Sequence, residues 1–446
     1  MNLIVKPGTA LRGSLAEELP GDKSISHRDA LFAALAEGTS RIENFQVSGV
    51  TRPMLQALTS LGVNWKLEGQ TLTVIGHGMA SLKNPSFPMD CGNSATTLRL
   101  LAGAVAGAGI RATLDGTPGL RRRPMDRIVD PLRQMGVEIE PSEGCTAPLS
   151  IRSRFAGQKL HPLNYELPVA SAQVKSCLML AALGAEGQTV LSEPGPSRDH
   201  TERMLSSMGV LVVSSNLGAR HVVEITPPDP LILSPLNLSL PADPSAAAFL
   251  IVAALITPGS SLELKGLCFN PTRTGLLEVL LNMGGNISIQ NKSLSAGEPV
   301  GDVRVNHSAL HGTEISGDLV VRMIDEFPIL AVAAAVAEGV TLVRDARELR
   351  HKESDRIAML AAELRLLGVK IEEHEDGFAI QGGAISGGTV QSHGDHRLAM
   401  SLAVAGLVAK SAVCVKDAQC TTESFPGYVD VMNKLGTDFK GEVKQP

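Results

Sequence analysis

Aromatic residues are scarce in this chain of 446 residues, where Phe, Trp and Tyr together make up 3% of the positions. Positive charge is not in excess either, because the formal net charge is −6. Proteins that bind nucleic acid usually carry a basic surface, and many use aromatic side chains to stack on bases. The composition therefore argues against a nucleic-acid partner, and any cationic binding site must be local.

Long hydrophobic runs and closely spaced cysteines are also absent. No apolar run reaches the roughly 18 residues typical of a membrane span, and the first residues fit neither a signal peptide nor a transit peptide. The six cysteines form no C-x-x-C pair, and no histidine cluster has zinc spacing. We therefore expect a soluble cytoplasmic protein with reduced thiols, no membrane contact and no metal.

Six helix-starting clusters recur along the chain at intervals of about 70 to 80 residues. Each precedes an apolar segment with helical character and, about forty residues later, a glycine that would end a second helix. The clusters contain Asp22, Asn93, Ser171, Asp243, Asp325 and Asp395. The period exceeds the roughly 20 to 50 residues of solenoid repeats. It predicts a small αβ module duplicated in tandem.

The repeat also predicts how the modules are arranged. Helices that are apolar on all sides are buried on all sides, so the expected arrangement has helices inside and sheets outside. A chain of 446 residues exceeds one hydrophobic core. Two domains of three modules each are therefore expected. A polar, proline-bearing stretch at residues 226–235 makes residues 235–242 a candidate crossover between them.

Two basic segments suggest anion binding. Lys23, Ser24 and Arg28 lie within a turn or two of a helix start, where free N–H groups and the helix dipole favour anions, although the spacing is not that of a P-loop. Residues 121–123 are three consecutive arginines, whose guanidinium groups suit carboxylate or phosphate. A capped helix with solvated charges and an exposed basic loop are the alternative interpretations.

Two acidic segments suggest proton transfer. Asp325 and Glu326 begin an apolar helix; one acid is expected to cap it, and a second among apolar neighbours could have a raised pKa and act as a base. If residues 350–356 are helical, Lys352 and Arg356 share a face and Asp355 lies near His351. A solvated helix face is the alternative for this second segment.

Taken together, these segments resemble the 5-enolpyruvylshikimate-3-phosphate synthase family of enolpyruvyl transferases. The shared motifs run in order along the chain and include Asp-Lys-Ser-x-Ser-x-Arg from Asp22, Gly-Asn-x-x-Thr-x-x-Arg from Gly92, Ser-Ala-Gln from Ser171, Asp-Glu-Phe-Pro from Asp325, Lys-Glu-Ser-Asp-Arg from Lys352 and Asp-His-Arg from Asp395. The resemblance implies an α/β fold, a two-domain inside-out α/β barrel of six βαβαββ modules, three per domain.

The resemblance also implies where the domains begin and end. One would comprise residues 1–20 and 240–446 and carry the phosphoenolpyruvate-side ligands. The other would comprise residues 21–239 and carry the shikimate 3-phosphate-side ligands, with the active site in the cleft between the domains. A monomer is expected. No cofactor is expected either, because the family's reaction needs neither redox chemistry nor a metal.

That reaction transfers the enolpyruvyl group of phosphoenolpyruvate to the 5-hydroxyl of shikimate 3-phosphate, through a tetrahedral intermediate, on the shikimate pathway to chorismate and the aromatic amino acids. By resemblance, Asp325 would take the hydroxyl proton, Glu353 would protonate C3 of the enolpyruvyl group, and Lys23 would assist both substrates. Shikimate 3-phosphate would contact Lys23, Ser24, Arg28, Ser171, Ala172, Gln173, Arg198, Asp325 and Lys352. Phosphoenolpyruvate would contact Lys23, Asn93, Ala95, Arg123, Gln173, Arg356 and Arg397.

Two positions depart from the common family pattern. Ala95 stands where many relatives have Gly, which would put a methyl group against the phosphoenolpyruvate pocket. Because the inhibitor glyphosate is longer than phosphoenolpyruvate, we expect it to inhibit weakly. Glu423 stands where many relatives have a Lys that contacts phosphoenolpyruvate, so that contact cannot be carried over. Both departures resemble a divergent, glyphosate-tolerant bacterial branch.

Two alternative functions fit the sequence less well. UDP-N-acetylglucosamine enolpyruvyl transferases use a cysteine in a glycine-rich loop before an Arg-Pro pair, but this chain has no cysteine between Cys91 and Cys145. A non-catalytic anion-binding relative would gain nothing from Asp325 and Glu353, since carboxylates repel phosphate. Both alternatives therefore rank below the enzyme that makes enolpyruvylshikimate 3-phosphate.

Overall fold

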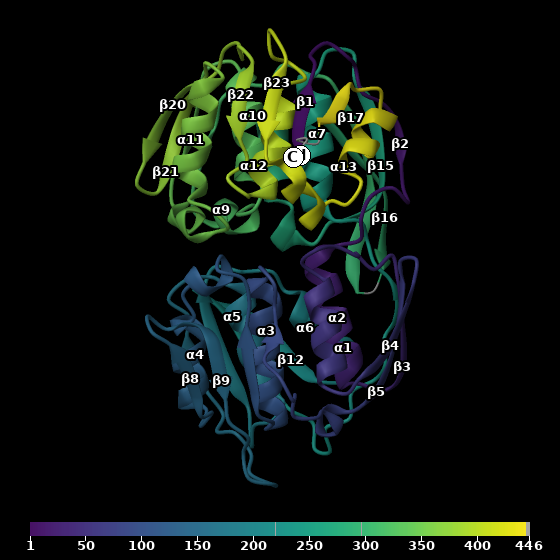
Figure 1. Ribbon diagram of the computed structural model, residues 1–446, viewed down its shortest axis with the longest axis vertical. Coiled ribbons are helices and arrows are strands. Elements are labelled where there is room, and N and C mark those ends of the chain that lie inside the picture. Colours follow the sequence, from purple (N-terminus) through teal and green to yellow (C-terminus); the bar gives the residue numbers. More distant parts are fainter. Residues whose placement is uncertain (219, 296, 443–446) are drawn as a thin grey trace. The chain divides into compact units, whose positions relative to one another are not determined.

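The chain folds into two units, which a computed structural model describes for residues 1–218, 220–295 and 297–442 (Figure 1). Unit 1 comprises Met1–Pro20, Pro241–Leu294 and Pro299–Pro446, and unit 2 comprises Gly21–Leu240 and Ser295–Glu298. The chain therefore begins in unit 1, builds nearly all of unit 2 and returns to unit 1. Nothing in the sequence pattern marks the short segment 295–298 as part of unit 2.

Unit 2 contains three four-stranded sheets, with strand orders β14-β3-β5-β4, β6-β7-β9-β8 and β10-β11-β13-β12. Their strands are β3 (Glu37–Glu43), β4 (Asn64–Glu68), β5 (Thr71–His77), β6 (Met89–Asp90), β7 (Ala112–Asp115), β8 (Ile139–Ser142), β9 (Thr146–Ile151), β10 (Asn164–Glu166), β11 (Thr189–Pro194), β12 (Leu211–Leu217), β13 (Arg220–Thr226) and β14 (Asn237–Ser239).

Unit 1 also contains three four-stranded sheets, with strand orders β22-β23-β1-β24, β16-β17-β15-β2 and β18-β19-β21-β20. Their strands are β1 (Asn2–Val5), β2 (Arg12–Leu15), β15 (Ser261–Cys268), β16 (Asn286–Ser295), β17 (Glu298–Asn306), β18 (Glu314–Ile315), β19 (Val340–Val343), β20 (Lys370–His374), β21 (Gly377–Gln381), β22 (Gly388–Gln391), β23 (Val413–Lys416) and β24 (Phe439–Glu442).

The six sheets share one pattern of strand directions. In each, a parallel pair is followed by an antiparallel pair, as in β14 with β3 and β3 with β5, or β2 with β15 and β15 with β17. Strand β1 pairs with both β23 and β24, which is why residues near the N-terminus belong to unit 1. The expected six repeated modules, three per unit, are confirmed.

Each module contributes one apolar helix to the interior of its unit. These helices are α1 (Lys23–Leu35), α3 (Ala95–Ala108), α5 (Ala172–Ala182), α7 (Pro244–Ile256), α10 (Phe327–Val336) and α12 (His396–Ala405). Along α7, every residue from Ser245 to Ile256 is buried. Helices α7, α10 and α12 pack against one another, while α3 packs against both α1 and α5, so helices lie inside and sheets outside, as expected (Figure 1).

A second helix in each module ends close to a glycine. These helices are α2 (Arg52–Ser60), α4 (Asp126–Gln134), α6 (His200–Ser207), α8 (Gly275–Asn282), α11 (Arg356–Leu366) and α13 (Tyr428–Lys434), and one further helix is α9 (Asp318–Arg322). The glycine two residues after each has a positive φ, from 79° at Gly62 to 100° at Gly436. Only glycine adopts this conformation without strain, so the predicted helix ends are confirmed.

Helices α3 and α5 approach unusually closely because two glycines remove side chains from the contact. A Cβ built on Gly103 would lie 2.1 Å from the Cys177 carbonyl oxygen, and one on Gly107 would lie 2.6 Å from that of Leu180. Such distances are far below van der Waals contact, so only glycine fits. The close packing places the starts of the two helices side by side, which matters for the candidate site.

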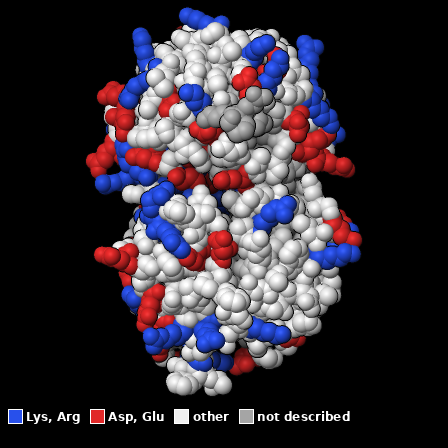
Figure 2. Space-filling model, viewed as in Figure 1, with Lys and Arg blue, Asp and Glu red and all other residues white. Residues whose placement is uncertain are grey.

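The remaining features agree with the composition. All six cysteines are free, and Cys91, Cys177, Cys268 and Cys420 are buried. Among the described residues, no helix is both long and apolar enough to cross a membrane. On the face drawn in Figure 2, basic and acidic side chains are intermixed over both units. Neither sign of charge therefore dominates that face.

Candidate functional site

Five of the six apolar helices start with a side chain that caps the helix. The oxygen of each capping side chain accepts a hydrogen bond from a backbone N–H two or three residues further along. The caps are Asp22, Ser94, Ser171, Asp243 and Asp395. The sixth helix, α10, has Glu326 at the cap position and no capping bond from that side chain. The prediction that an acid caps this helix is therefore wrong for Glu326, the residue at the cap position.

The starts of α3 and α5 are joined by one glutamine. The Gln173 side-chain amide donates to Thr96 Oγ1 at 2.9 Å, and its carbonyl oxygen accepts from Arg99 Nη1 at 2.6 Å. Ser171 and Ala172 begin α5 immediately before Gln173 and are partly exposed. The predicted ligands from α5 thus lie beside the Asn93–Thr96 turn, as a binding site for one small anion would require.

Four predicted ligands of shikimate 3-phosphate gather at the start of α1. Arg198 Nη1 donates to Ser24 Oγ at 3.0 Å, and Lys23 next to Ser24 is partly exposed. Arg28 is only 2% exposed, and its guanidinium donates to the Ser24 carbonyl oxygen at 2.9 Å and to Thr201 Oγ1 at 2.8 Å. Arg28 therefore holds the first turn of α1 from the protein interior.

The predicted phosphoenolpyruvate ligands of unit 2 lie on two loops and a helix start. Asn93 Oδ1 accepts from Thr117 Oγ1 at 3.2 Å. Ala95 is the first residue of α3 and is 4% exposed. Arg123 follows the short helix η2 (Leu120–Arg122) and is partly exposed, whereas Arg121 forms an ion pair with Asp115. Of the three consecutive arginines, Arg121 thus has a structural partner.

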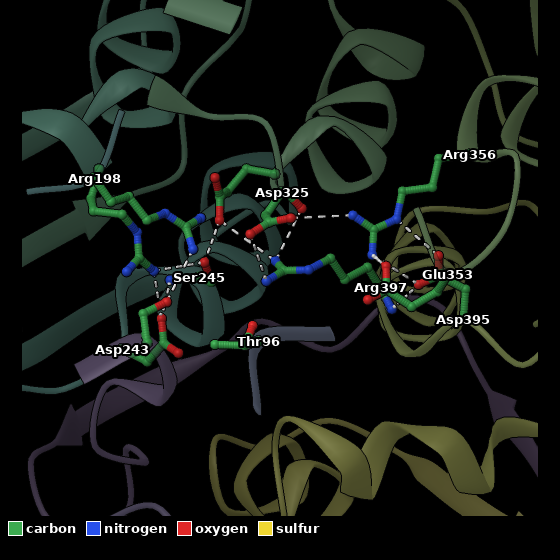
Figure 3. A network of polar contacts seen from close by, with 12 residues as sticks. Thr96, Arg198, Asp243, Ser245, Asp325, Glu353, Arg356, Asp395 and Arg397 are labelled. Carbon is green, nitrogen blue, oxygen red and sulfur yellow. Dashed lines mark hydrogen bonds and ion pairs between the residues drawn. The ribbon is translucent and has the colours of Figure 1, made fainter. Parts of the chain in front are cut away.

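In unit 1, the guanidinium of Arg356 lies among three carboxylates (Figure 3). Its Nη2 donates to Glu353 Oε2 at 2.6 Å and its Nε to Asp395 Oδ2 at 2.8 Å, while Nη1 lies 3.4 Å from Asp325 Oδ1. The side chains of Asp325 and Glu353 are 19% and 23% exposed, and that of Asp395 is fully buried. Two of the three acids can therefore reach a bound molecule.

The protonation states in this network follow from its geometry. Burial opposes the charge on Arg356, but Asp395 and then Glu353 outweigh it and raise the pKa of Arg356 above its ordinary value. Burial likewise disfavours the Asp395 carboxylate, yet Arg356 keeps the pKa of Asp395 below its usual range. The buried ion pair of Arg356 and Asp395 thus stays charged, and Arg356 holds the side chains of Asp325 and Glu353 in place.

Arg397 ties the start of α12 to the start of α10. Its Nη1 donates to the backbone oxygen of Asp325 at 3.0 Å and lies 3.5 Å from Glu326 Oε1, and its Nη2 lies 3.6 Å from Asp325 Oδ2 (Figure 3). The Ser245 hydroxyl, at the start of α7, donates to Glu326. Glu326 therefore connects the first turns of three helices instead of capping its own.

The segment around Lys352 is not the helix that charge spacing predicted. A short helix, η4 (Arg347–His351), ends before Lys352, which is extended, and α11 begins only at Arg356. Asp355 caps α11 and accepts from Arg350 Nη1 at 2.9 Å, so its expected pairing with His351 is wrong. The extended backbone breaks the helical spacing that would have put Lys352 and Arg356 on one face.

Lys352 is a partly exposed basic residue of unit 1. Within the described parts of the chain, its ammonium group has neither a hydrogen bond nor an ion pair. Burial lowers the pKa of Lys352, only partly offset by attraction to Asp325. An ammonium held in a partly buried place without a partner is suited to bind an anion.

Three residues of this arrangement had no role in the sequence prediction. In the sequence, Asp395 is only a helix start, Glu326 is one of two acids that could cap a helix or act as a base, and Arg99 is only part of a motif. Asp395 and Arg356 are 39 residues apart in the chain, so no local pattern links them. A charged residue inside an apolar helix, as at Arg99, is the kind of signal that could have found such a partner.

One group of side chains in the described residues has the composition of a metal site. Ligand atoms of Asp199, His200 and Glu298, all in unit 2, lie within 4.8 Å of one another. Arg203, however, donates from Nε to Asp199 Oδ2 at 2.9 Å, and the same nitrogen lies 3.8 Å from Glu298 Oε2. The carboxylates of Asp199 and Glu298 already share the Arg203 guanidinium as a counter-ion, so we interpret this group as an ion-pair cluster.

Comparisons with known proteins agree with the motifs. Residues 5–432 match the family described as EPSP synthase (3-phosphoshikimate 1-carboxyvinyltransferase). A 3-phosphoshikimate 1-carboxyvinyltransferase of Citrifermentans bemidjiense is 45% identical over 435 residues, covering 97% of this chain and 98% of the relative. That of Herpetosiphon aurantiacus is 47% identical over 431 residues, covering 96% and 98%.

Solved structures show the same likeness. An EPSP synthase from Acinetobacter baumannii is 38% identical with a TM-score of 0.86, covering 98% of this chain and 99% of that one. The enolpyruvyl transferase NikO from Streptomyces tendae has a TM-score of 0.77 at 19% identity, covering 98% of both chains. The second likeness speaks for the fold alone, and together they establish the expected α/β architecture.

Proposed function

Because this chain belongs to the EPSP synthase (3-phosphoshikimate 1-carboxyvinyltransferase) family of transferases, we propose that it transfers the enolpyruvyl group of phosphoenolpyruvate to the 5-hydroxyl of shikimate 3-phosphate. The observation that carries the proposal is the Arg356 network, in which one guanidinium holds the partly exposed carboxylates of Asp325 and Glu353. Addition to an enol ester requires both a base and an acid, and two carboxyl groups supply them when Asp325 is ionised and Glu353 is protonated.

In the proposed first step, Asp325 takes the proton of the 5-hydroxyl while that oxygen attacks C2 of phosphoenolpyruvate. Glu353 gives its proton to C3, which becomes a methyl group, and a tetrahedral intermediate forms. In the second step, the Glu353 carboxylate takes a proton back from this methyl group, and phosphate leaves C2 with the proton held by Asp325, which restores the double bond and both starting protonation states. Arg356 orients both carboxylates, and it also binds phosphoenolpyruvate in the proposal.

The cationic residues have a clear electrostatic task in this reaction. Two organophosphates repel each other and lose hydration when they bind together, so fixed positive charges must offset both effects. Unit 2 offers Lys23, Arg123 and Arg198, and unit 1 offers Lys352 and Arg397. Each unit carries only part of the proposed set, so the reaction requires both.

The polar residues of unit 2 complete the proposed substrate contacts. Ser24, Arg28, Ser171, Ala172 and Gln173 would bind shikimate 3-phosphate, with Arg28 acting through the first turn of α1 that it holds. Asn93 and Ala95, together with Gln173, would bind phosphoenolpyruvate. The methyl group of Ala95 would disfavour the longer glyphosate molecule. We further propose that the enzyme works as a monomer in the cytoplasm.

The proposal is tested by incubating the purified chain with both substrates and measuring phosphate release, with product identity checked by mass spectrometry. Phosphate release that depends on shikimate 3-phosphate is expected. Replacing shikimate 3-phosphate with UDP-N-acetylglucosamine should give none. Absence of phosphate release with shikimate 3-phosphate, or equal release with the nucleotide sugar, would overturn the proposal.

A further inference from the structure

A lysine with two glutamates is buried in unit 2. Lys175 of α5 lies 2.7 Å from Glu193 Oε1 at the end of β11 and 2.7 Å from Glu202 Oε1 on α6. The three side chains are 1%, 1% and 6% exposed. Although burial opposes its charge, the attraction of Glu202 and Glu193 keeps the pKa of Lys175 above its ordinary value.

Such a cluster is expensive to bury, and apolar side chains of similar size often stabilise a protein as well or better. The buried lysine–glutamate cluster is therefore expected to have a role other than stabilising the fold. Glu193 differs from Glu202 in its further contacts. Glu193 Oε1 accepts from both the backbone N–H and the hydroxyl of Ser197 at 2.9 Å, and its Oε2 accepts from the backbone N–H of Ser171 at 3.3 Å.

Both serines adjoin proposed ligands of shikimate 3-phosphate. Ser171 is itself one of them and caps α5. Ser197 directly precedes Arg198, whose guanidinium donates to Ser24 Oγ at 3.0 Å. Lys175 Nζ also donates to the Ser197 carbonyl oxygen at 3.4 Å. One carboxylate thus fixes the backbone of two separate segments that would contact the same substrate.

We propose that Glu193, with Lys175 as its counter-ion, is a positioning residue that holds the start of α5 and the Ser197–Arg198 segment in register for shikimate 3-phosphate. The inference rests on the function proposed above. Preorganised donors lose less conformational entropy when they bind, so the benefit appears as substrate affinity. Phosphoenolpyruvate, whose proposed ligands lie on other segments except for Gln173, should be less affected.

Glu202 provides a matched control within the same cluster. It contacts the same ammonium at the same distance, 2.7 Å, but it has no contact with Ser171 or Ser197 among the described interactions. Glu193→Gln and Glu202→Gln therefore remove the same charge from the same lysine. Only the first disturbs the two substrate-binding segments, because an amide cannot accept from all the donors that face Glu193.

The test is calorimetry of shikimate 3-phosphate binding to the full chain, together with KM for each substrate and the thermal midpoint of every variant. Glu193→Gln should raise the Kd for shikimate 3-phosphate about ten- to hundredfold, with KM for phosphoenolpyruvate changed less than threefold or so. Glu202→Gln should lower the thermal midpoint to a similar degree while the Kd stays within about twofold of wild type. Equal effects of the two variants on Kd would overturn the inference.

Ser197→Ala keeps the test decisive if Glu193→Gln does not fold. It removes one donor to Glu193 without leaving a buried charge unpaired, and we expect a few-fold rise in Kd, roughly the value of one hydrogen bond. An unchanged Kd in Ser197→Ala would then overturn the inference. Failure of the proposed function looks different, because the wild-type chain itself would not bind shikimate 3-phosphate.

Discussion

The start of α10 differs from the starts of the other five apolar helices. At those five, a side chain satisfies its own helix by accepting from a backbone N–H. At α10, Glu326 reaches instead to Ser245 and Arg397, and Asp325 lies against Arg356 and Arg397. The module repeats, but here the acids are used to connect helices and to present a carboxylate. A departure from the repeat marks the place where chemistry is expected.

The two units differ in the same sense in how they treat acids. In unit 2, Glu193 and Glu202 are almost completely buried behind the helix starts and paired with Lys175. In unit 1, Asp325 and Glu353 are about a fifth exposed and share Arg356. Carboxylates near bound phosphate cost affinity, so exposed acids in a phosphate-binding site are expected to have a role in the reaction. Under the proposed function, both units therefore bind substrate, but the two acids that transfer protons lie in unit 1.

The largest expected effect tests this division. Asp325→Asn keeps the size of the side chain but removes the base, so kcat should fall by several orders of magnitude, roughly 4 to 6 kcal/mol in activation free energy. Shikimate 3-phosphate binding should change little. Phosphate release and calorimetry measure the two quantities. Normal turnover of Asp325→Asn would place the base elsewhere.

Glu326→Gln is the control at the neighbouring position. Because Glu326 holds Ser245 and Arg397 instead of a substrate atom, its amide variant should lose stability, about 1–3 kcal/mol in the free energy of unfolding. Its kcat should fall far less than that of Asp325→Asn. If the two variants lost equal activity, the start of α10 would act as one structural element and the contrast with the other helices would lose its catalytic meaning.

The second prediction concerns Lys352, whose ammonium group has neither a hydrogen bond nor an ion pair among the described residues. Lys352→Met should weaken anion binding by about 2–5 kcal/mol while making the unliganded protein more stable, because a costly buried charge is removed. Unfolding in urea and calorimetry with shikimate 3-phosphate give the two signs. Lys370→Met, at an exposed position of β20, should change neither.

The pH dependence of this effect has a definite sign. Since burial lowers the pKa of Lys352, the unfolded chain holds the proton more strongly and protonation favours unfolding. The stability advantage of Lys352→Met should therefore be largest near neutral pH and shrink as the pH rises through the alkaline range where the folded wild type deprotonates. A constant advantage would show that packing, not charge, causes it.

Much of this arrangement was predictable from the sequence, and the failures share a cause. The six apolar helices and the glycines that end the second helices follow from local periodicity and backbone sterics, which act over a few residues. The partner of Arg356 at Asp395 and the role of Glu326 depend on which helix starts come together, which no local pattern records. The extended backbone at Lys352 could not be predicted, because the spacing of the charges in this segment is also compatible with a helix.

The third prediction concerns the neutral helix starts of unit 2. Ala95→Gly removes the methyl group from the first residue of α3 and should tighten glyphosate inhibition, since relieving an overfilled site is worth roughly 1–3 kcal/mol. Phosphoenolpyruvate, being shorter, should gain much less. The ratio of the glyphosate inhibition constant to KM for phosphoenolpyruvate is the measurement. Tight inhibition of the wild type that Ala95→Gly leaves unchanged would refute the assignment of Ala95.

The smallest expected effect comes from replacing the neutral cap of α3, Ser94, with an aspartate like those that cap α7 and α12 in unit 1. Ser94→Ala removes the cap of α3 and should cost about 1 kcal/mol of unfolding free energy. Ser94→Asp restores a capping oxygen and should recover most of that stability. The added carboxylate should nevertheless raise KM for phosphoenolpyruvate several-fold, because it repels the anion in the proposed site. If Ser94→Asp matched wild type in both stability and KM, the neutral cap of α3 would not matter for phosphoenolpyruvate binding.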